Sequence, residues 1–425
     1  MIDIAILGYG VVGSGVAEVV EMNQEAIRRR TGRGLRIKRI LDIRDFPGDP
    51  FADRIVHDPE TIFNDPDIAV VAETIGGTGA AYAMTRRALE AGKHVVTSNK
   101  ELVALHGPEL MSLAYRMQLN YLFEASVGGG IPIIRPLHKC LAANEIDRIS
   151  GILNGTTNYI LTRMEKTGLS FGEALAEAQA KGYAEQDPTA DVEGTDAARK
   201  IAILSSIAYE EYVDARQVRC EGISQLSRED MACAGALDCR LKLLASSRRT
   251  GDGRYDIRVA PTLVPKDHPL AVAEDVYNAI LVEGNALGQA MFYGRGAGRL
   301  PTASAVVADV VESVLHIGRI PHFHLWRKTD RDCLVPPDEA PVSACLRVTG
   351  SPGSPEASEA ALRAALDRLG ETCLVERISG FVTDPGTCVA VRLGGDGRLT
   401  EAGLARIRSG LETGGIRVLS VLRDI

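Results

Sequence analysis

The sequence lacks the features that would mark a membrane protein, a nucleic-acid-binding protein or a zinc protein. No apolar run reaches the length that spans a bilayer. The formal net charge of −8 leaves no basic surface for nucleic acid or for an anionic membrane. The 8 cysteines form no CxxC pair, and the 8 histidines show no metal-ligand spacing. These absences argue against a zinc site and a disulfide framework, and they predict a protein of the reducing cytoplasm.

We also expect the first residues to form a strand and not an export signal. The segment MIDIAILGYG contains no basic stretch and no cleavage site, and it is typical of a strand that enters a turn. The chain has 425 residues, of which 45% are hydrophobic and 24% are charged. This length and composition predict a soluble protein of two or three domains.

The first motif is a glycine pattern between an expected strand and an expected helix. The apolar run 2–7 leads into GYGVVG, and apolar residues then recur at helical spacing. In a strand–GxGxxG–helix unit the glycines permit a tight turn, the approach of a pyrophosphate and close packing of helix on strand. The alternative is a turn that is rich in glycine for packing alone. The residues expected at a dinucleotide are Gly8, Tyr9, Gly10, Val12 and Gly13.

The end of the next expected strand, 35–41, bears on the choice of dinucleotide. Asp42 stands where a carboxylate accepts hydrogen bonds from the adenosine ribose of NAD and repels the 2′-phosphate of NADP. Arg44 has the opposite preference, because a guanidinium holds a phosphate. We expect Asp42 to prevail, because it is closer to the end of the strand while Arg44 can swing into solvent. The sequence thus predicts NAD or NADP as cofactor and favours NAD.

Polar residues follow further expected strands of the same parallel sheet. The strands are 69–72, 94–97 and 119–124, and a helix is expected over 80–91. Open parallel sheets bind ligands at the carboxyl ends of their strands, which favours a site over isolated loop charges. The residues that we place at this edge are Thr74, Gly76, Ser98, Lys100 and Glu124.

The middle of the chain changes character at 127–132, VGGGIP, which has the composition of a hinge. An expected strand, 149–153, leads into the polar turn NGTTNY at the start of a helix. Thr156 there suits a polar small molecule, although Thr156 or Thr157 could instead cap the helix. More sheet is expected over 256–264 and 279–282, and a helix follows the glycine-rich turn 292–302.

The stretch 182–200, GYAEQDPTADVEGTDAARK, carries the strongest chemical signal. Turn formers occupy its first part, and helical periodicity begins at Thr195. Asp196 and Lys200 lie one turn apart on that helix, and Lys200 falls in its apolar stripe. A lysine that is buried beside a carboxylate is suited to exchange protons. The alternative is an ordinary ion pair on the helix surface, which fits Arg199, Glu210 and Glu211 better than Lys200.

The last part of the chain has its own pattern. A polar linker with prolines, 326–341, precedes an expected order of strand, helix, two strands, helix and strand over 342–425. The order βαββαβ is that of a ferredoxin-like fold. Its elements are expected at 343–349, 356–369, 373–378, 388–393, 400–412 and 416–422.

Over residues 1–330 the sequence resembles the homoserine dehydrogenases. The stretches that carry the resemblance are LGYGVVGSGV, ETIGG, TSNKELVA, FEASVGGGIPIIRPL, GILNGTTNYIL, GYAEQDPTADVEGTDAARKIAIL and YGRGAGRLPTASAVVAD. The resemblance implies interconversion of L-homoserine and L-aspartate 4-semialdehyde with NAD(H) or NADP(H). It also implies a Rossmann-type α/β domain of 1–130 plus about 302–325, and an α+β catalytic and dimerisation domain of 131–301 with a mixed sheet.

The same resemblance implies roles for individual residues. Lys200 is expected to carry the proton, with Lys100 near the nicotinamide. Substrate binding is expected of Glu185, Asp196, Asp191, Thr156 and Tyr183, and Gly182 and Glu185 are also expected near the cofactor. A monovalent cation, usually sodium, is expected at Glu124, Val127, Gly129 and Ile131, mostly on backbone carbonyls.

The C-terminal unit occupies the place of an ACT-like regulatory domain, which in relatives binds an amino acid such as L-threonine. Its loop GSPGSP, 350–355, departs from the family pattern, so a structural or dimerising role is an equal alternative. The whole chain is expected to form a homodimer or a larger homo-oligomer. Two other functions stay open: a dinucleotide and amino-acid sensor without turnover, and a dehydrogenase for another amino acid such as aspartate.

Overall fold

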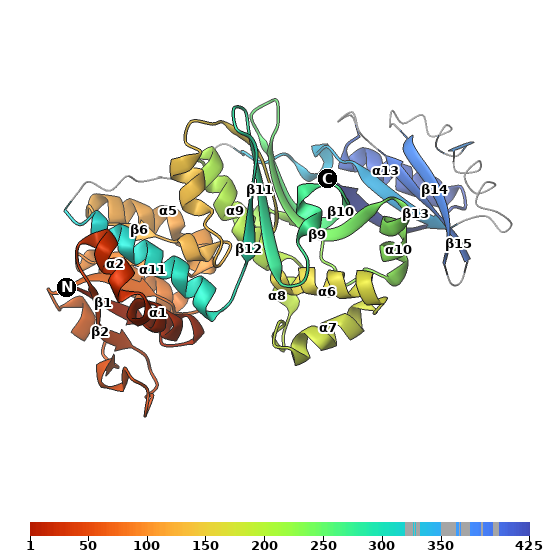
Figure 1. Cartoon of the computed structure of the whole chain (residues 1–425). Helices are drawn as coiled ribbons and strands as arrows, with labels where there is room; N and C mark the ends of the chain where they lie inside the picture. Colours follow the sequence, from red (N-terminus) through yellow and green to blue (C-terminus); the bar gives the residue numbers. More distant parts are fainter. Residues whose placement is uncertain are drawn as a thin grey trace. The chain divides into compact units, whose positions relative to one another are not determined.

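The computed structural model describes residues 1–318, 326, 328, 332–349, 363–364, 366, 375–383, 386–393 and 399–425. These residues form two compact units (Figure 1). The first unit contains Met1–Ile149, Arg199–Gln217 and Val282–Asp332, and the second contains Ser150–Ala198, Val218–Leu281 and Cys333–Ile425. No helix in the described part of the chain is both long and apolar enough to cross a membrane.

The first unit is built on a parallel sheet whose central strands are mostly apolar and buried. Among the described residues it has six strands in the order β3-β2-β1-β4-β5-β6, which is the Rossmann order. The predicted α/β fold is therefore confirmed. The strands are β1 (Ile2–Leu7), β2 (Leu35–Leu41), β3 (Ile55–Val56), β4 (Ile68–Glu73), β5 (His94–Thr97) and β6 (Tyr121–Leu122).

Helices cover this sheet, and one of them comes from late in the sequence. Helix α11 packs on α1 in one apolar cluster that includes Val16, Val20, Val306 and Val310. The two helices approach so closely that a Cβ on Gly15 would lie 2.8 Å from the Arg299 carbonyl oxygen. The helices of this unit are α1 (Val11–Met22), α2 (Gln24–Thr31), α3 (Glu60–Phe63), α4 (Gly79–Glu90), α5 (Lys100–Arg116) and α11 (Arg299–Leu315).

The expected strand over 119–124 is wrong at its end. Only Tyr121 and Leu122 pair with β5, and Glu124 begins a tight 3-10 turn. The Glu124 N–H donates to the Asp309 carboxylate at 2.7 Å instead of joining the sheet. A carboxylate on α11 therefore ends the strand early, which the local sequence did not reveal.

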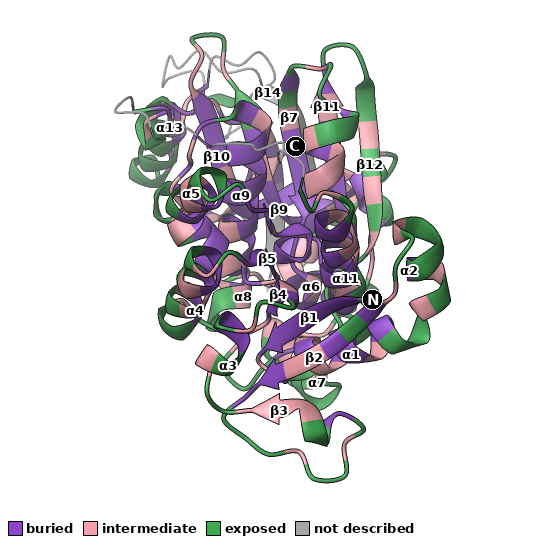
Figure 2. Ribbon diagram, turned by 90° about the vertical axis from the view of Figure 1, so that its left-hand side faces the viewer, coloured by how far each residue is buried: buried purple, intermediate pink, exposed green. Residues whose placement is uncertain are grey.

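The second large sheet is mixed, as the family resemblance implied. Among the described residues its order is β12-β11-β7-β9-β10-β16-β13-β15-β14, with β8 also paired to β10. Strand β10 runs antiparallel to β9 and parallel to β8 and β16. Figure 2 shows β9 and β10 buried over most of their length, whereas the edge strand β12 is exposed or half-buried. The strands before the linker are β7 (Ile146–Ile152), β8 (Arg219–Cys220), β9 (Cys239–Arg249), β10 (Tyr255–Pro265), β11 (Tyr277–Gly284) and β12 (Gly288–Arg295).

The helices between these strands begin at polar caps. Ser170 and Ser227 each form a reciprocal capping box with the acidic residue three positions later, at the starts of α7 and α10. The helices are α6 (Gly155–Thr167), α7 (Phe171–Ala180), α8 (Thr189–Val192), α9 (Thr195–Tyr209) and α10 (Arg228–Ala236). Helix α9 begins in the second unit and ends in the first.

The C-terminal strands extend the mixed sheet and have the ferredoxin-like order β16-β13-β15-β14. The elements are β13 (Ala344–Thr349), β14 (Val375–Thr383), β15 (Gly386–Leu393), α13 (Glu401–Thr413) and β16 (Val418–Asp424). Most of the expected helix 356–369 and the loop 350–355 lie outside the described residues. Arg423 and Asp424 of β16 pair in parallel with Thr262 and Leu263 of β10, so one sheet joins the C-terminal part to the preceding part.

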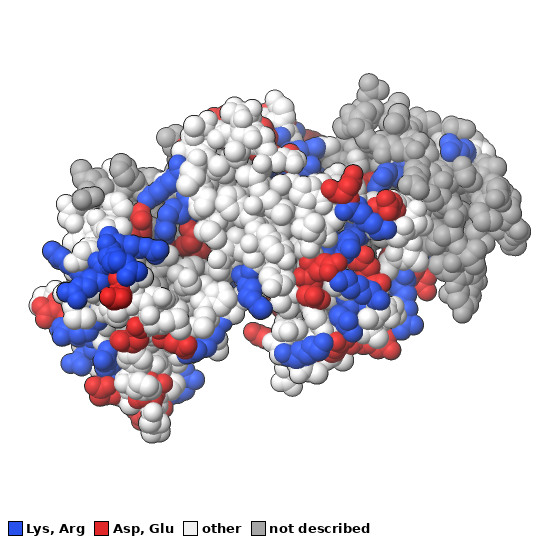
Figure 3. Space-filling model, viewed as in Figure 1, with Lys and Arg blue, Asp and Glu red and all other residues white. Residues whose placement is uncertain are grey.

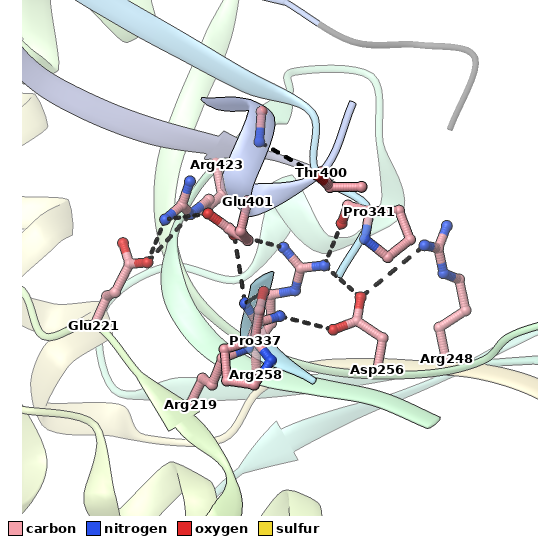
Figure 4. A network of polar contacts seen from close by, with 11 residues as sticks. Arg219, Glu221, Arg248, Asp256, Arg258, Pro337, Pro341, Thr400, Glu401 and Arg423 are labelled. Carbon is pink, nitrogen blue, oxygen red and sulfur yellow. Dashed lines mark hydrogen bonds and ion pairs between the residues drawn. The ribbon is translucent and has the colours of Figure 1, made fainter. Parts of the chain in front are cut away.

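A charged network strengthens this junction (Figure 4). Arg219 donates to Asp256 at 2.9 Å, and Arg258 pairs with the same carboxylate. Both arginines also lie 3.6 Å from Glu401 at the start of α13. On the other side, Arg423 lies 3.3 Å from Glu401. Side chains from β8, β10, α13 and β16 therefore form one network of ion pairs.

Candidate active site

The glycine loop after β1 forms a cradle for an anionic group. Gly8 has a φ of +89°, and a Cβ on Gly13 would lie 2.0 Å from the Gly8 carbonyl oxygen. Gly10 is the N-cap of α1 and has no side chain to cap the helix. The first N–H groups of α1, from Val11, Val12 and Gly13, are thus available to a phosphate, which the helix dipole also favours. The donor set of the loop fits the pyrophosphate of a dinucleotide.

Asp42 ties the end of β2 to this loop, and Arg44 lies on it. The Tyr9 N–H donates to Asp42 Oδ2 at 2.7 Å. Arg44 Nε and Nη2 donate to the two carboxylate oxygens at 3.0 and 3.1 Å. The Arg44 guanidinium holds the pKa of the Asp42 carboxyl at about 2. The buried carboxylate thus attracts the guanidinium, although 59% of the Arg44 side chain remains exposed.

The loops after β4 and β5 are fastened to each other. Thr97 Oγ1 donates to the buried Glu73 carboxyl at 2.5 Å, and the Ile75 N–H donates to its other oxygen at 2.6 Å. Burial raises the pKa of Glu73 to about 7. Asn99 Nδ2 donates to the carbonyls of Ile75 and Gly77 at 3.0 and 2.6 Å. These contacts bring together the two loops that contain Thr74, Gly76, Ser98 and Lys100.

Lys100 is the first residue of α5 and is half-buried. Asn99 caps this helix, because its Oδ1 accepts the Leu102 N–H at 3.0 Å. The same asparagine therefore holds the neighbouring loop and fixes the start of the helix that bears Lys100. Sequence reasoning missed Asn99, although an asparagine directly before a helix is a recognised cap signal.

The Glu124 carboxylate holds the start of the next segment by accepting backbone hydrogen bonds. Oε1 accepts the N–H groups of Ile133 and Ile134 at 2.7 and 2.9 Å, and Oε2 accepts that of Arg135 at 2.8 Å. Gly128 and Gly129 in the intervening turn have φ of +76° and +55°. A Cβ on Gly129 would lie 2.3 Å from the Gly296 carbonyl oxygen, so only glycine fits there. Val127 and Ile131 in this turn are also buried.

A cavity of about 90 Å³ lies beside Glu124 in the first unit. It is lined by residues of both charges, including Arg135, Glu312 and Asp309. Arg135 donates to the buried Asp309 carboxylate at 2.5 Å. Burial nevertheless raises the pKa of Asp309 to about 7. Among the described residues no group of three or more histidine, cysteine, aspartate or glutamate side chains could hold a metal ion.

In the second unit one asparagine joins two carboxylates that are distant in sequence. Asn154 Nδ2 donates to Asp191 Oδ1 at 2.6 Å and to Asp196 Oδ2 at 2.9 Å. Its Oδ1 accepts the Thr157 N–H at 2.9 Å and so caps α6. Two carboxylates held side by side suit a cationic group such as a substrate ammonium. The cap of α6 is therefore Asn154, and the alternative that Thr156 or Thr157 caps the helix is wrong.

The first turn of α6 also holds the GYAE segment. Thr156 Oγ1 donates to the Tyr183 carbonyl at 2.7 Å, and the Tyr159 and Tyr183 rings meet edge to face at 5.0 Å. The turn at Gly182 has a φ of +72°, which favours glycine. Glu185 is exposed, and its backbone carbonyl accepts a bond from Gln179. Thr156 and Tyr183 thus contact each other, whereas Glu185 presents its side chain to solvent.

Lys200 is buried on α9, as the apolar stripe predicted, and so are Ile203 and Ile207. Asp196, one turn earlier on the helix, is buried as well. Arg199 makes the ordinary ion pair that was expected of it, 2.9 Å from Glu101.

Glu211 departs from the expected pattern. It was expected on the surface, and its exposed fraction is only 8%. It follows α9 and Glu210, whose φ of 55° turns the chain away from the helical path. The expected surface position of Glu211 is therefore wrong.

Comparison with known proteins identifies the family. The sequence model described as "Homoserine dehydrogenase, NAD binding domain" matches residues 8–124, and the one described as "Homoserine dehydrogenase" matches residues 132–311. The homoserine dehydrogenase of Neisseria gonorrhoeae is 42% identical over 355 residues, which are 82% of this chain and 81% of that protein. The homoserine dehydrogenase of Pseudomonas aeruginosa is 44% identical over 349 residues, 81% of this chain and 80% of that protein.

Solved structures agree. A homoserine dehydrogenase from Thiobacillus denitrificans superimposes with a TM-score of 0.90 at 35% identity and covers 100% of this chain and 98% of its own. A hyperthermophilic archaeal homoserine dehydrogenase in complex with NADPH gives a TM-score of 0.63 at 29% identity, over 75% of this chain and 99% of its own. The chain therefore belongs to the homoserine dehydrogenase family and is a nicotinamide-dependent oxidoreductase.

Proposed function

We propose that the chain interconverts L-homoserine and L-aspartate 4-semialdehyde, on the route to threonine, methionine and isoleucine. The observation that carries this proposal is the pair of carboxylates, Asp191 and Asp196, that Asn154 holds together on the segment leading to Lys200. Two fixed carboxylates suit the substrate ammonium, and a buried lysine suits proton transfer. A cytoplasmic setting fits such a biosynthetic step.

Each residue has a distinct part in the proposed reaction. NAD(P) held by the first unit would supply the hydride chemistry at the carbon that carries the hydroxyl group, in either direction. Lys200 takes the hydroxyl proton, and Lys100 lies near the reacting oxygen. Glu185 and Asp196 pair with the substrate ammonium, and Asp191 supports them. Thr156 and Tyr183 complete the wall of the substrate site.

The cofactor site uses the loops of the first unit. The N–H groups of the glycine loop, from Gly8 to Gly13, with Tyr9, Gly10 and Val12 between them, would hold the pyrophosphate. The loops after β4 and β5 would supply Thr74, Gly76 and Ser98. We also propose Gly182 and Glu185 as cofactor-binding residues. We propose NAD rather than NADP, because Asp42 is the acid at the end of β2.

We further propose a monovalent cation, most simply Na⁺, at the turn that follows Glu124. Its ligands are the backbone carbonyls of Glu124, Val127, Gly129 and Ile131. The Glu124 carboxylate already accepts three N–H groups, so it supports the turn and is not a ligand. Activity assayed with Na⁺, K⁺ or a large organic cation as the only monovalent ion tests this site. Equal rates in all three would exclude it.

The proposed assembly is a homodimer or a larger homo-oligomer. Figure 3 shows few charged side chains over the hairpin of β11 and β12, and Met291 and Tyr293 are 40% and 48% exposed there. Light scattering of the protein and of a Tyr293→Glu variant tests whether this apolar face forms the contact. An unchanged mass for the variant would exclude it.

For the C-terminal part we propose an ACT-like domain, supported by its strand order. It either binds an amino-acid effector such as L-threonine or acts structurally. Calorimetric titration with L-threonine separates these roles, because only the first gives a saturable heat.

The decisive experiment for the main proposal is an initial-rate assay with L-homoserine and each of NAD and NADP. Turnover with homoserine and none with aspartate supports the proposal. Turnover only with another amino acid would indicate a different dehydrogenase. Binding of dinucleotide without any turnover would indicate a sensor, the class that has no need of a buried proton carrier.

A further inference from the structure

One lysine of the second unit is buried more deeply than Lys200, which belongs to the first. Lys242 lies in the middle of β9, and only 1% of it is exposed. Its Nζ donates to Asn158 Oδ1 at 3.0 Å and to the Ala273 carbonyl at 2.7 Å, both of which are neutral acceptors. Burial lowers the pKa of Lys242 to about 8. Taking a cationic head out of water is costly, so its retention calls for a role that an apolar side chain cannot perform.

Asn158 extends the contacts of Lys242 to a whole backbone segment. Its Nδ2 donates to the carbonyls of Ala273, Asp275 and Tyr277 at 3.2, 3.0 and 3.0 Å. The Asp275 N–H donates to Thr162 Oγ1 at 3.1 Å. Asp275 has a φ of 52°, a left-handed conformation that is unfavourable for a residue with a side chain. The side chains of α6 and β9 therefore hold the segment 273–277 in one conformation.

The segment 273–277 packs directly against the start of α6. A Cβ on Gly155 would lie 2.9 Å from the Val276 carbonyl oxygen, so no other residue fits without a shift. Asn154, the residue before Gly155, caps α6 and donates to Asp191 and Asp196. A displacement of the segment 273–277 would move Gly155 and, with it, the amide that holds the two carboxylates.

We propose that Lys242 and Asn158 position the two carboxylates that bind the substrate, Asp191 and Asp196. As positioning residues, they act through the segment 273–277 and through Asn154. This inference rests on the proposed function, because it assigns Asp191 and Asp196 to the substrate ammonium. Lys242 is well suited to this role, because an ammonium has three donors and no acceptor and so draws several oxygens toward one point. A methionine of similar length fills the same space and draws none.

The test compares Lys242→Met with Lys266→Met in the full-length enzyme. Lys266 is about half exposed and lies 2.9 Å from Asp238, so it serves as a lysine outside this network. We expect Lys242→Met to raise the homoserine KM at least tenfold while the KM for the dinucleotide changes less than twofold. Lys266→Met should leave both unchanged. A merely structural role would lower the thermal midpoint and the active fraction but leave both KM values as they are, and that result would overturn the proposal.

A double-mutant cycle with Asn154→Ala tests the route of the effect. If Lys242 acts through Asn154, Lys242→Met adds little to the homoserine KM once Asn154 is alanine. Full additivity of the two changes would overturn the route. Should Lys242→Met fail to fold, Thr162→Val replaces it, because it removes the bond to the Asp275 N–H with almost no change in volume.

Asp196→Asn separates this inference from the proposed function. An unchanged homoserine KM in Asp196→Asn would contradict the proposed function itself. A raised KM in Asp196→Asn together with an unchanged KM in Lys242→Met and in Thr162→Val would contradict only the positioning role. Raised values in all of these variants would support both.

Discussion

Arg44 lies on the carboxylate of Asp42 with its fork of donors: Nε is 3.0 Å from Oδ1 and Nη2 is 3.1 Å from Oδ2. The backbone N–H groups of Arg44 and Tyr9 also donate to this carboxylate. Four donors thus occupy the group that would accept the ribose hydroxyls of NAD. A ribose must displace the Arg44 side chain, which is 59% exposed and free to move outward.

This pair leads to a prediction on cofactor choice. We expect the wild-type kcat/KM to favour NAD over NADP, and Asp42→Ser to narrow or reverse the ratio. Arg44→Met should raise the ratio at least tenfold, because it frees the carboxylate for the ribose and removes a cation from the 2′-phosphate. Two unit charges about 4 Å apart interact by roughly 4 kcal/mol at an effective dielectric near 20, so even a strongly screened remainder reaches tenfold. Initial rates with both cofactors measure it.

Arg29→Met provides the control, because Arg29 is exposed on α2 and its ion pair within the described residues is with its helix neighbour Glu25 at 3.8 Å. Its NAD to NADP ratio should equal that of the wild type. A wild-type preference for NADP would mean that Arg44, and not Asp42, faces the ribose.

A second prediction concerns the two lysines of the proposed reaction. Lys200→Ala and Lys100→Ala should each lower kcat by at least about 100-fold, the scale of general acid–base catalysis. Lys100 is the first residue of α5 and Lys200 is buried in α9, yet neither substitution removes a helix cap. The fold should therefore persist, as circular dichroism can check. Turnover near the wild-type value in both variants would remove the proposed chemistry.

Glu185→Gln should mainly raise the homoserine KM. Glu185 is exposed in the described structure, so its carboxylate is accessible to an incoming ammonium. Losing one charge-assisted bond costs about 1.5–3 kcal/mol, which corresponds to roughly 10- to 150-fold in KM. Glu193→Gln, in the same segment, is the matched control and should leave the KM unchanged. An unaltered KM for Glu185→Gln would show that this carboxylate does not meet the substrate.

The sequence predicted those elements whose signal is local. Strand β1 was predicted residue by residue, because its sequence IDIAIL is almost wholly apolar and the parallel sheet buries it along its length. Strand β2 was predicted over the same residues as observed, and its apolar residues are buried while the charged residues between them are not. Strand β9 was missed, because buried Lys242 and Ser247 interrupt its apolar pattern. No pattern in the neighbouring sequence predicts that a lysine inside a strand donates to acceptors on α6 and in the segment 273–277.

The residues of the candidate site also differ in whether a local sequence signal predicts them. The glycine loop and the strand-end residues follow from motifs at fixed places in a βα unit. The roles of Asn99 and Asn154 do not, because each bonds to residues more than 20 positions away. Asn154 stands 37 residues before Asp191, and only the fold brings the two side chains together. An asparagine at the start of a helix was the one available signal for either residue.

Arg347 and Asp230 should couple the C-terminal strands to α10 energetically. Arg347 Nε donates to Asp230 Oδ1 at 2.9 Å, and both residues are buried. Removing one partner of such a pair costs about 3–5 kcal/mol, because it leaves a buried charge uncompensated. Arg347→Met should therefore lower the free energy of unfolding by that amount, measured by urea denaturation. The double variant with Asp230→Asn should recover a large part of the loss.

Arg408→Met is the matched control for Arg347→Met. Arg408 lies on α13, is 56% exposed and pairs with Glu412 at 3.4 Å, so its loss should cost less than about 1 kcal/mol. Equal effects of the two substitutions would show that the junction between β13 and α10 contributes no more than the surface does.

Glu73 should make the stability of the protein fall as the pH rises from about 5 to 7. Burial raises the pKa of its carboxyl from 4.5 to about 7. Between these two values the folded protein holds a proton that the unfolded chain releases, so raising the pH favours unfolding. A difference of about 2.5 pKa values corresponds to roughly 3 kcal/mol once the pH exceeds 7. Glu73→Gln stays neutral throughout and should not show this part of the fall.

Urea unfolding of the wild type and of Glu73→Gln at several pH values between 5 and 8 measures the effect. Every other titrating group, including buried Asp309, is common to both proteins, so the difference between the two curves reports Glu73 alone. Glu25→Gln is the control, since the Glu25 side chain is 94% exposed, and its curve should follow the wild type. Parallel curves for wild type and Glu73→Gln would mean that Glu73 is ionised in the folded protein. In that case its bonds to Thr97 Oγ1 and the Ile75 N–H would outweigh the cost of burying the charge.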